Sequence, residues 1–317
     1  MKTCFLKKYK CKNYKDFIIE PQFIELLNTL INMDNLNILF IGNSGSGKTS
    51  IIESTIREYY NTPNIPSYNV LYINNLKEQG IQYYRNEVKT FCQIKSDIPK
   101  KKKFVVLDDL DSINDQSQQV FRNCIDKYSH NVNFLASCCN NQKIIESLQS
   151  RFLILKIKPI SKNLLKKVLN KIVKNEKIKI TPDTSNFIIN ICNNSIRMLI
   201  NYLEKFKLIN KNITINDAKN ICTNISFLDF ENYTNLWYIQ KKHKESIKCI
   251  FNIYYKGYSV MDILDNYFHF IKITDIIDEK TKYEIIKIIC KYISIFHNTH
   301  EYDIELAFFT NDLIQNI

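Results

Sequence analysis

The sequence predicts an α/β domain built on a parallel sheet, followed by a C-terminal part that is helical throughout. A glycine-rich loop at 42–47 lies between an apolar strand pattern, NILFI, and a helical pattern, SIIESTIREYY. A second apolar run, FVVL at 104–107, has the length of a buried strand and ends in an acidic cluster. From about residue 226 onward only helical patterns occur, such as KYEIIKIICKYISIF. Strands that alternate with helices indicate parallel pairing, with a ligand site at the carboxyl ends of the strands.

The composition bounds the size and class of the protein. Its 317 residues suffice for two or three domains with cores of their own. The net charge of +12 suits a polyanionic partner. No apolar run approaches the roughly 18 residues that a membrane span requires, so we expect no membrane partner. The ten cysteines are scattered without metal-binding spacing. This predicts a reducing, intracellular location.

The glycine-rich loop fits the phosphate-binding motif G-x-x-x-x-G-K-[ST]. Its glycines let backbone N–H groups turn toward phosphate oxygens, and the N-terminus of the following helix adds partial positive charge. We expect Lys48 to reach the β- and γ-phosphates of ATP and the Thr49 hydroxyl to bind Mg²⁺. The residues predicted to hold the nucleotide here are Gly42, Asn43, Ser44, Gly45, Ser46, Gly47, Lys48, Thr49 and Ser50.

The acidic cluster LDDLDSI follows the second predicted strand. Asp108 stands where a carboxylate would hold Mg²⁺ through water, and Asp109 where a base would orient the attacking water. Asp111 is expected to position the turn. Together with the glycine loop, these residues predict a P-loop nucleoside triphosphatase.

Further segments, in order along the chain, resemble the small subunits of replication factor C, the AAA+ sliding-clamp loader. They are VLYINNLKEQGI at 70–81, QYYRNEVKTF at 82–91, VFRNCIDKYSHNVNF at 120–134, KIIESLQSRF at 143–152, NNSIRMLINYL at 193–203 and GYSVMDILDNYF at 257–268. Four of the five arginines, Arg85, Arg122, Arg151 and Arg197, fall on arginines of these motifs. Arg57 does not, and we expect it to be a solvent-exposed helix residue.

The resemblance covers essentially the whole chain and implies three domains. Residues 1–157 would form the AAA+ ATPase domain, 158–225 a small helical lid, and 226–317 a helical collar through which subunits join. An independent helical domain with its own core is the alternative for the last part.

The resemblance also implies roles for single residues. Tyr9 and Lys10 match a segment near the adenine, and Ile18 is a candidate apolar wall for the base. Arg197 would touch the γ-phosphate in the same subunit, whereas Arg151 would act in trans on the next subunit's site. With Asp109, these two arginines are the candidate catalytic residues.

Two further contacts follow from the same resemblance. Arg85 and Lys89 lie four residues apart and would contact the phosphates of primer–template DNA without reading its sequence; Arg85 pairing with Glu87 or Glu78 is the alternative. Ile113 matches a position that touches the clamp, or else it packs locally at the start of a helix. The implied partners are the sliding clamp, DNA and the other subunits of a hetero-pentameric loader. The implied location is the nucleus for a eukaryotic cellular protein, or the site of viral replication for a viral one.

The chain departs from the family pattern at two positions. Asp109 replaces a glutamate, and Cys139 stands where an asparagine is expected, with Asn140 and Asn141 directly behind it. The implied function is ATP-dependent clamp loading in DNA replication. The alternative is a structural subunit that binds nucleotide, hydrolyses little and lends Arg151 to its neighbour. An AAA+ initiator or helicase loader is disfavoured, because the tail has only helical patterns.

Overall fold

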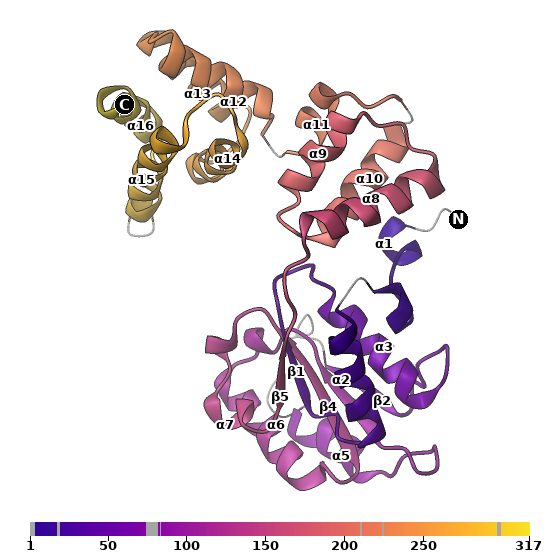
Figure 1. The fold of residues 1–317 in the computed structure, drawn as a ribbon. Helices are drawn as coiled ribbons and strands as arrows, with labels where there is room; N and C mark the ends of the chain where they lie inside the picture. The colour runs from indigo at the N-terminus through magenta and orange to yellow at the C-terminus, as the bar shows by residue number, and fades with distance from the viewer. Residues whose placement is uncertain are drawn as a thin grey trace. The chain divides into compact units, whose positions relative to one another are not determined.

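The structure, a computed structural model, describes residues 4–17, 20–73, 82, 84–209, 211–223, 225–296 and 299–317. The chain forms two compact units (Figure 1). Unit 1 comprises Met1–Val168 and Asn194–Asn201, and unit 2 comprises Leu169–Asn193 and Tyr202–Ile317. The proposed division into three domains stays a prediction.

Unit 1 is built on a five-stranded sheet in which every described pair of strands is parallel. Its strands are β1 (Ile38–Ile41), β2 (Val70–Ile73), β3 (Lys103–Leu107), β4 (Val132–Cys138) and β5 (Leu153–Lys156). Their order is β2-β3-β4-β1-β5. The two strands expected at 37–41 and 104–107 are therefore confirmed as β1 and β3. All residues of β3 and β4 are buried, as expected for central strands of a parallel sheet.

Helices cover both faces of this sheet (Figure 1). Successive side chains of a strand point to opposite faces, so Phe40 packs with one set of helices and Leu39 with the other. The first set is α2 (Pro21–Asn32) and α3 (Lys48–Tyr60); the second is α5 (Lys89–Gln93), α6 (Asp115–Tyr128) and α7 (Glu146–Gln149). Shorter turns are α1 (Phe5–Lys8), η1 (Tyr14–Asp16), η2 (Tyr84–Val88), η3 (Leu110–Ser112) and η4 (Asn141–Lys143).

Apart from one isolated β-bridge, the regular structure described in unit 2 is helical. Its helices are α9 (Pro182–Ile191), α11 (Ile215–Ile221), α12 (Phe227–Thr234), η5 (Asn235–Ile239), α13 (His243–Tyr254), α14 (Val260–Ile273), α15 (Glu279–Phe296) and α16 (Ile304–Asn316). Two further helices, α8 (Lys162–Glu176) and α10 (Ile196–Ile209), have residues in both units. The helical pattern expected from residue 226 onward is confirmed.

The C-terminal helices share a buried aromatic core. The Trp237 indole donates a hydrogen bond to the Tyr267 hydroxyl over 3.1 Å, so the polar atoms of both rings are satisfied inside the core. Tyr233 and Thr310 pair through their hydroxyls at 2.9 Å. Among the helices that the structure describes, none is both long enough and apolar enough to cross a membrane.

Candidate nucleotide-binding site

The sheet order assembles the site from three separate parts of the sequence. Strand β4 lies between β1 and β3, with Cys138 beside Ile41 and Ala136 beside Leu107. The glycine loop leaves β1 and Asp108 leaves β3, so both flank the carboxyl end of β4. Residues 137–139 are therefore placed between the two motifs that the sequence identified.

The glycine loop closes tightly onto the start of α3. Gly45 and Gly47 have φ angles of +76° and +96°, a region that side chains with a Cβ avoid. Lys48 begins the helix, and its residue is only 7% exposed. Its Nζ donates to the carbonyl oxygens of Gly42 and Asn43 over 2.8 and 3.2 Å. The lysine is thus held inside the loop that would surround a phosphate.

The donors around this loop fit a phosphate group. The first N–H groups of α3 have no partners within the helix, and its N-terminus favours an anion. The Ser46 hydroxyl is buried and has no hydrogen-bond partner among the described residues. A phosphate oxygen would satisfy these donors, and the Lys48 ammonium would neutralise its charge.

Hard oxygen donors adjoin the loop. The Thr49 hydroxyl donates to Asp108, with Oγ1 3.1 Å from Oδ2 and 3.3 Å from Oδ1. Mg²⁺ binds one or two such protein groups together with phosphate oxygens and waters. No cluster of three or more acidic, histidine or cysteine side chains suited to a metal occurs in the described part of the chain. Thr49 and Asp108 therefore fit an ion that arrives with its nucleotide.

Asp109 lies beside Asp108 in a left-handed backbone conformation, with φ 51° and ψ 53°. Partial burial raises the pKa of its carboxyl above the ordinary value, and the negative charge of Asp108 raises it further. The positive charges of Lys48 and Arg197 act in the opposite direction. The charges of Asp108, Asp111, Lys48 and Arg197 therefore all act on the Asp109 carboxyl.

The loop after β4 decides which side chain faces Lys48. Lys48 Nζ lies 3.2 Å from Cys139 Sγ. The Asn140 side chain instead caps η4 by accepting from the Gln142 N–H, and the Asn141 amide donates to Gln149 over 2.8 Å. Neither amide therefore replaces the expected asparagine, and a thiol occupies that position.

Asp111 has a role that its spacing only hinted at. Its Oδ2 accepts the backbone N–H groups of Cys139 and Asn140 at 3.1 and 3.0 Å. The carboxylate thus ties the turn after β3 to the loop after β4. The expectation that Asp111 positions the turn is confirmed, although its partners lie 28 and 29 residues away.

Arg197 is brought to the glycine loop from the distant segment 194–201, which belongs to unit 1. A Cβ placed on Gly45 would lie 2.2 Å from Ser195 Oγ and 3.4 Å from Arg197 Cβ. No sequence spacing could reveal this approach, because about 150 residues separate the two segments.

Gly45→Ala is expected to weaken nucleotide binding by pushing Ser195 and Arg197 away from the loop. The left-handed backbone alone costs about 1–2 kcal/mol, and the overlap with Ser195 adds to it. Gly257→Ala is a matched control, since Gly257 has φ +98° with no atom within 4 Å of its Cβ position. Titration with a fluorescent ATP analogue should show the loss in the first variant alone. Equal affinity in both would contradict the close approach, and Gly45→Ala/Ser195→Ala should recover part of the affinity.

The N-terminal candidates lie near the start of α3. Lys10 forms an ion pair with Glu53 at 2.6 Å, and Arg57 holds the same carboxylate at 3.0 Å. The Arg57 side chain is 16% exposed, so the expectation of a solvent-exposed residue is wrong. Its guanidinium also donates to the Lys12 carbonyl oxygen over 3.4 Å, which links the N-terminal segment to α3. Tyr9 packs edge-on against Phe5. Ile18 lies outside the described residues.

Arg151 lies at the end of α7 and is held by α6. Its Nε contacts Asp126 Oδ1 at 3.2 Å, and its Nη1 donates to the Ser150 hydroxyl over 2.7 Å. Arg122 approaches the other oxygen of Asp126 at 3.8 Å. Two of the motif arginines therefore share one carboxylate.

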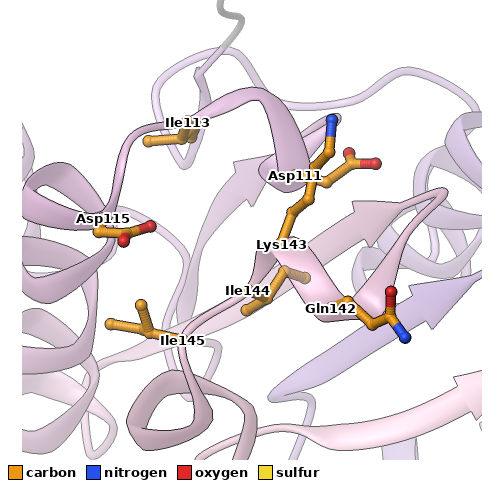
Figure 2. Close-up of a pocket in the computed structure, with 7 residues that line it drawn as sticks. All are labelled: Asp111, Ile113, Asp115, Gln142, Lys143, Ile144 and Ile145. Atoms are coloured by element: carbon orange, nitrogen blue, oxygen red, sulfur yellow. The ribbon is translucent and has the colours of Figure 1, made fainter.

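The remaining candidates lie elsewhere on unit 1. Arg85 and Lys89 are exposed on η2 and α5. Ile113 is 7% exposed and belongs to the core, which agrees with local packing at the start of α6. It also borders a pocket of about 410 Å³, lined by Asp111, Ile113, Asp115, Gln142, Lys143, Ile144 and Ile145 (Figure 2).

Known proteins resemble the chain in sequence. Residues 38–159 match the family model "ATPase family associated with various cellular activities (AAA)". A replication factor C small subunit of Picrophilus torridus is 30% identical over 205 residues, 64% of either chain. A putative replication factor C small subunit of Acanthamoeba polyphaga mimivirus is 26% identical over 286 residues, covering 90% of this chain and 88% of that one. A probable replication factor C subunit 5 of Caenorhabditis elegans is 25% identical, covering 87% and 77%.

The chain spans only part of the length of two archaeal relatives. It spans 64% of the Picrophilus torridus protein and 62% of a replication factor C small subunit of Methanoregula boonei, less than two thirds of each.

Solved structures share the fold at low sequence identity. The RuvB Holliday junction branch migration motor of Thermotoga maritima has a TM-score of 0.53 at 12% identity, covering 74% of this chain and 80% of that one. Domain III of the replication initiation protein DnaA from the same organism has a TM-score of 0.51 at 17% identity, covering 66% and 95%. These likenesses concern the fold alone. Residues 38–159 thus match the AAA family of ATPases, and the chain is similar in sequence to replication factor C small subunits.

Proposed function

We propose that the protein is one subunit of a hetero-pentameric clamp loader, which uses ATP to load a ring-shaped sliding clamp onto primer–template DNA. The observation that carries the proposal is the grouping of Lys48, Thr49 and Asp108 at the carboxyl edge of the sheet. It occurs in a chain whose relatives are named replication factor C small subunits.

The proposed roles follow the geometry of the site. Lys48 and the N–H groups of the glycine loop hold the phosphates, and Arg197 approaches the γ-phosphate from the segment beside Gly45. Thr49 and Asp108 would hold Mg²⁺, which would supply positive charge beside the phosphates. Asp109 orients water for attack, which requires its ionised form.

The base of the nucleotide would lie near the N-terminal segment. Tyr9 and Lys10 remain its proposed contacts, as does Ile18. Phe17 supports this placement, because its ring lies 4.0 Å from the Cβ position of Gly47. Lys10 is already paired with Glu53, so its contribution would be to fix the segment rather than to contact phosphate.

Arg151 is proposed to complete the site of a neighbouring subunit. Asp126 holds the guanidinium of Arg151 at the end of α7, and the Arg151 side chain is still about a third exposed. If the Arg151 guanidinium reached a neighbour's phosphate, the negatively charged phosphate would replace the Asp126 carboxylate as its hydrogen-bond acceptor. The geometry thus supports a finger that is held in place before subunits assemble.

DNA and clamp contacts are proposed on separate parts of unit 1. Arg85 and Lys89 are exposed, and the chain carries a net charge of +12. Such contacts go to phosphates, so binding should weaken steeply with salt and not depend on sequence. Ile113, with Ile144 and Ile145 in the same pocket, is the proposed clamp contact. Subunits would join through the helices of 226–317, where Ile304 and Phe308 of α16 are exposed.

A second candidate function is a structural subunit that binds ATP but hydrolyses little. Asp109 is one methylene shorter than the glutamate of the family, and errors of about 1 Å in placement can cost about 10²-fold in rate. The side chain that faces Lys48 is the thiol of Cys139 and not an amide, which also favours a structural subunit. Both candidates require nucleotide binding and differ only in turnover.

Lys48→Ala should reduce the affinity of the full chain for MgATP about 10- to 100-fold, because it removes a charged hydrogen-bond donor worth about 1.5–3 kcal/mol. Calorimetric titration measures the change. Lys256→Ala is the matched control, since that lysine pairs with Asp229 in unit 2. In the assembled loader Lys48→Ala should stop clamp loading, measured by fluorescence of labelled clamp and DNA. Unchanged affinity and loading in Lys48→Ala would contradict the proposed function.

A further inference from the structure

One buried hydroxyl contacts both acidic residues of the site. Ser137 lies on β4, the strand between β1 and β3, and is fully buried. Its Oγ donates to Asp108 Oδ1 over 2.5 Å and accepts the Asp109 backbone N–H at 3.1 Å. The register explains the meeting, because Leu107 pairs with Ala136 and the next residue of each strand is Asp108 and Ser137.

The first of these bonds fixes the orientation of Asp108. With Oδ1 held by Ser137, Oδ2 is the carboxylate oxygen closer to Thr49, at 3.1 Å. A carboxylate free to rotate would present either oxygen to the ion in several directions. The short bond from Ser137 therefore selects one direction before the ion arrives, and such preorganisation strengthens metal binding.

The second bond supports the backbone of Asp109. A residue with a Cβ loses about 1–2 kcal/mol in the left-handed conformation, and Asp109 adopts it two residues after the end of β3. The hydrogen bond from its N–H to Ser137 stabilises this turn. One hydroxyl thus holds the carboxylate of Asp108 and the backbone of Asp109.

We propose that Ser137 is a positioning residue that prepares Asp108 for Mg²⁺ and fixes the turn at Asp109. This inference rests on the proposed function, since it assumes that Thr49 and Asp108 bind the Mg²⁺ that accompanies the nucleotide. Ser137 contacts no substrate; it acts through the two aspartates.

The test uses the full chain and a mant-labelled ATP. Two quantities are measured: the affinity in EDTA, and the Mg²⁺ concentration that gives a half-maximal change in fluorescence. In Ser137→Ala the half-maximal Mg²⁺ concentration should rise about 10- to 100-fold, the usual effect of removing a partner of a metal ligand. Affinity in EDTA should stay within about twofold, because Lys48 and the glycine loop are intact.

Two variants separate positioning from packing. Ser137→Cys keeps most of the volume but replaces the hydroxyl by a weak donor, so it should behave like Ser137→Ala. Ser246→Ala removes an equally buried serine hydroxyl of unit 2 and should leave the Mg²⁺ dependence unchanged. Thermal unfolding checks that each variant is folded.

Each result has a defined meaning. A shift in both Ser137 variants, with affinity in EDTA preserved, supports the inference. Wild-type Mg²⁺ dependence in either Ser137 variant, or an equal loss of affinity in EDTA, overturns it. If the wild-type chain binds the nucleotide without any response to Mg²⁺, the proposed function itself fails, which is a different outcome.

Discussion

Replacing Arg151 with alanine is expected to lower turnover at the neighbouring subunit's ATP site about 10³- to 10⁵-fold, the range that arginine fingers supply in other nucleotide hydrolases. The planar guanidinium stabilises charge that develops on the transferring phosphoryl group. Arg151 lies just after α7 with Asp126 and Ser150 as its partners, and neither partner belongs to the Lys48 loop of its own chain. The affinity of its own site for MgATP should therefore not change.

The measurement compares steady-state ATP turnover of the assembled loader with nucleotide binding by the isolated variant. Arg151→Lys should recover little activity, because an ammonium lacks the bidentate fork. Arg122→Ala is a matched control that removes the other guanidinium near Asp126 and should retain most of the turnover. A loader with Arg151→Ala that hydrolyses ATP at the wild-type rate would show that this arginine is not a finger.

Asp109→Asn separates the two candidate functions. If the subunit hydrolyses ATP, loss of the base should lower its turnover about 10²- to 10⁴-fold, with MgATP affinity nearly unchanged because Lys48, Thr49 and Asp108 remain. Turnover should be measured with DNA and clamp present, with only this subunit altered. An unchanged rate would favour the structural role, in which the chain contributes Arg151 but no base of its own.

The pH dependence gives Asp109 a signature of its own. Its pKa is raised above the ordinary value by partial burial and by the charge of Asp108. The base must be ionised, so kcat/KM should fall as the pH drops through this raised pKa, and the acid limb should lie higher than for an ordinary aspartate. Asp109→Asn should remove that limb. Asp109→Glu restores the missing methylene and should raise turnover, by up to about 10²-fold if placement limits the rate.

Much of the site could be predicted from local sequence, because local chemistry determines it. The glycine loop requires positive φ at Gly45 and Gly47, and it must join a strand to a helix start, so its motif is contiguous. Asp108 directly follows the apolar strand β3, so this part of the site is also visible in contiguous residues. The strands, the glycine loop and the helical tail all appear in the structure as expected.

Other parts of the site depend on which strands are neighbours. Ser137 was not predicted, because a serine in an apolar strand carries no signal until that strand is known to lie beside Asp108. The approach of Ser195 to Gly45 joins segments about 150 residues apart. Arg57, expected on the surface, pairs with Glu53 one turn earlier on α3 and also donates to the Lys12 carbonyl oxygen of the N-terminal segment.

The sequence by itself therefore determined the phosphate loop, the acidic pair, the α/β class and the helical C-terminal part, since each is written in contiguous residues. The tertiary structure alone decided that Cys139 rather than Asn140 or Asn141 faces Lys48, that Asp111 ties two loops together, and that Ser137 contacts both aspartates. The physical reason is the strand order: inserting β4 between β1 and β3 brings its last residues to both motifs, and no spacing along the chain records that insertion.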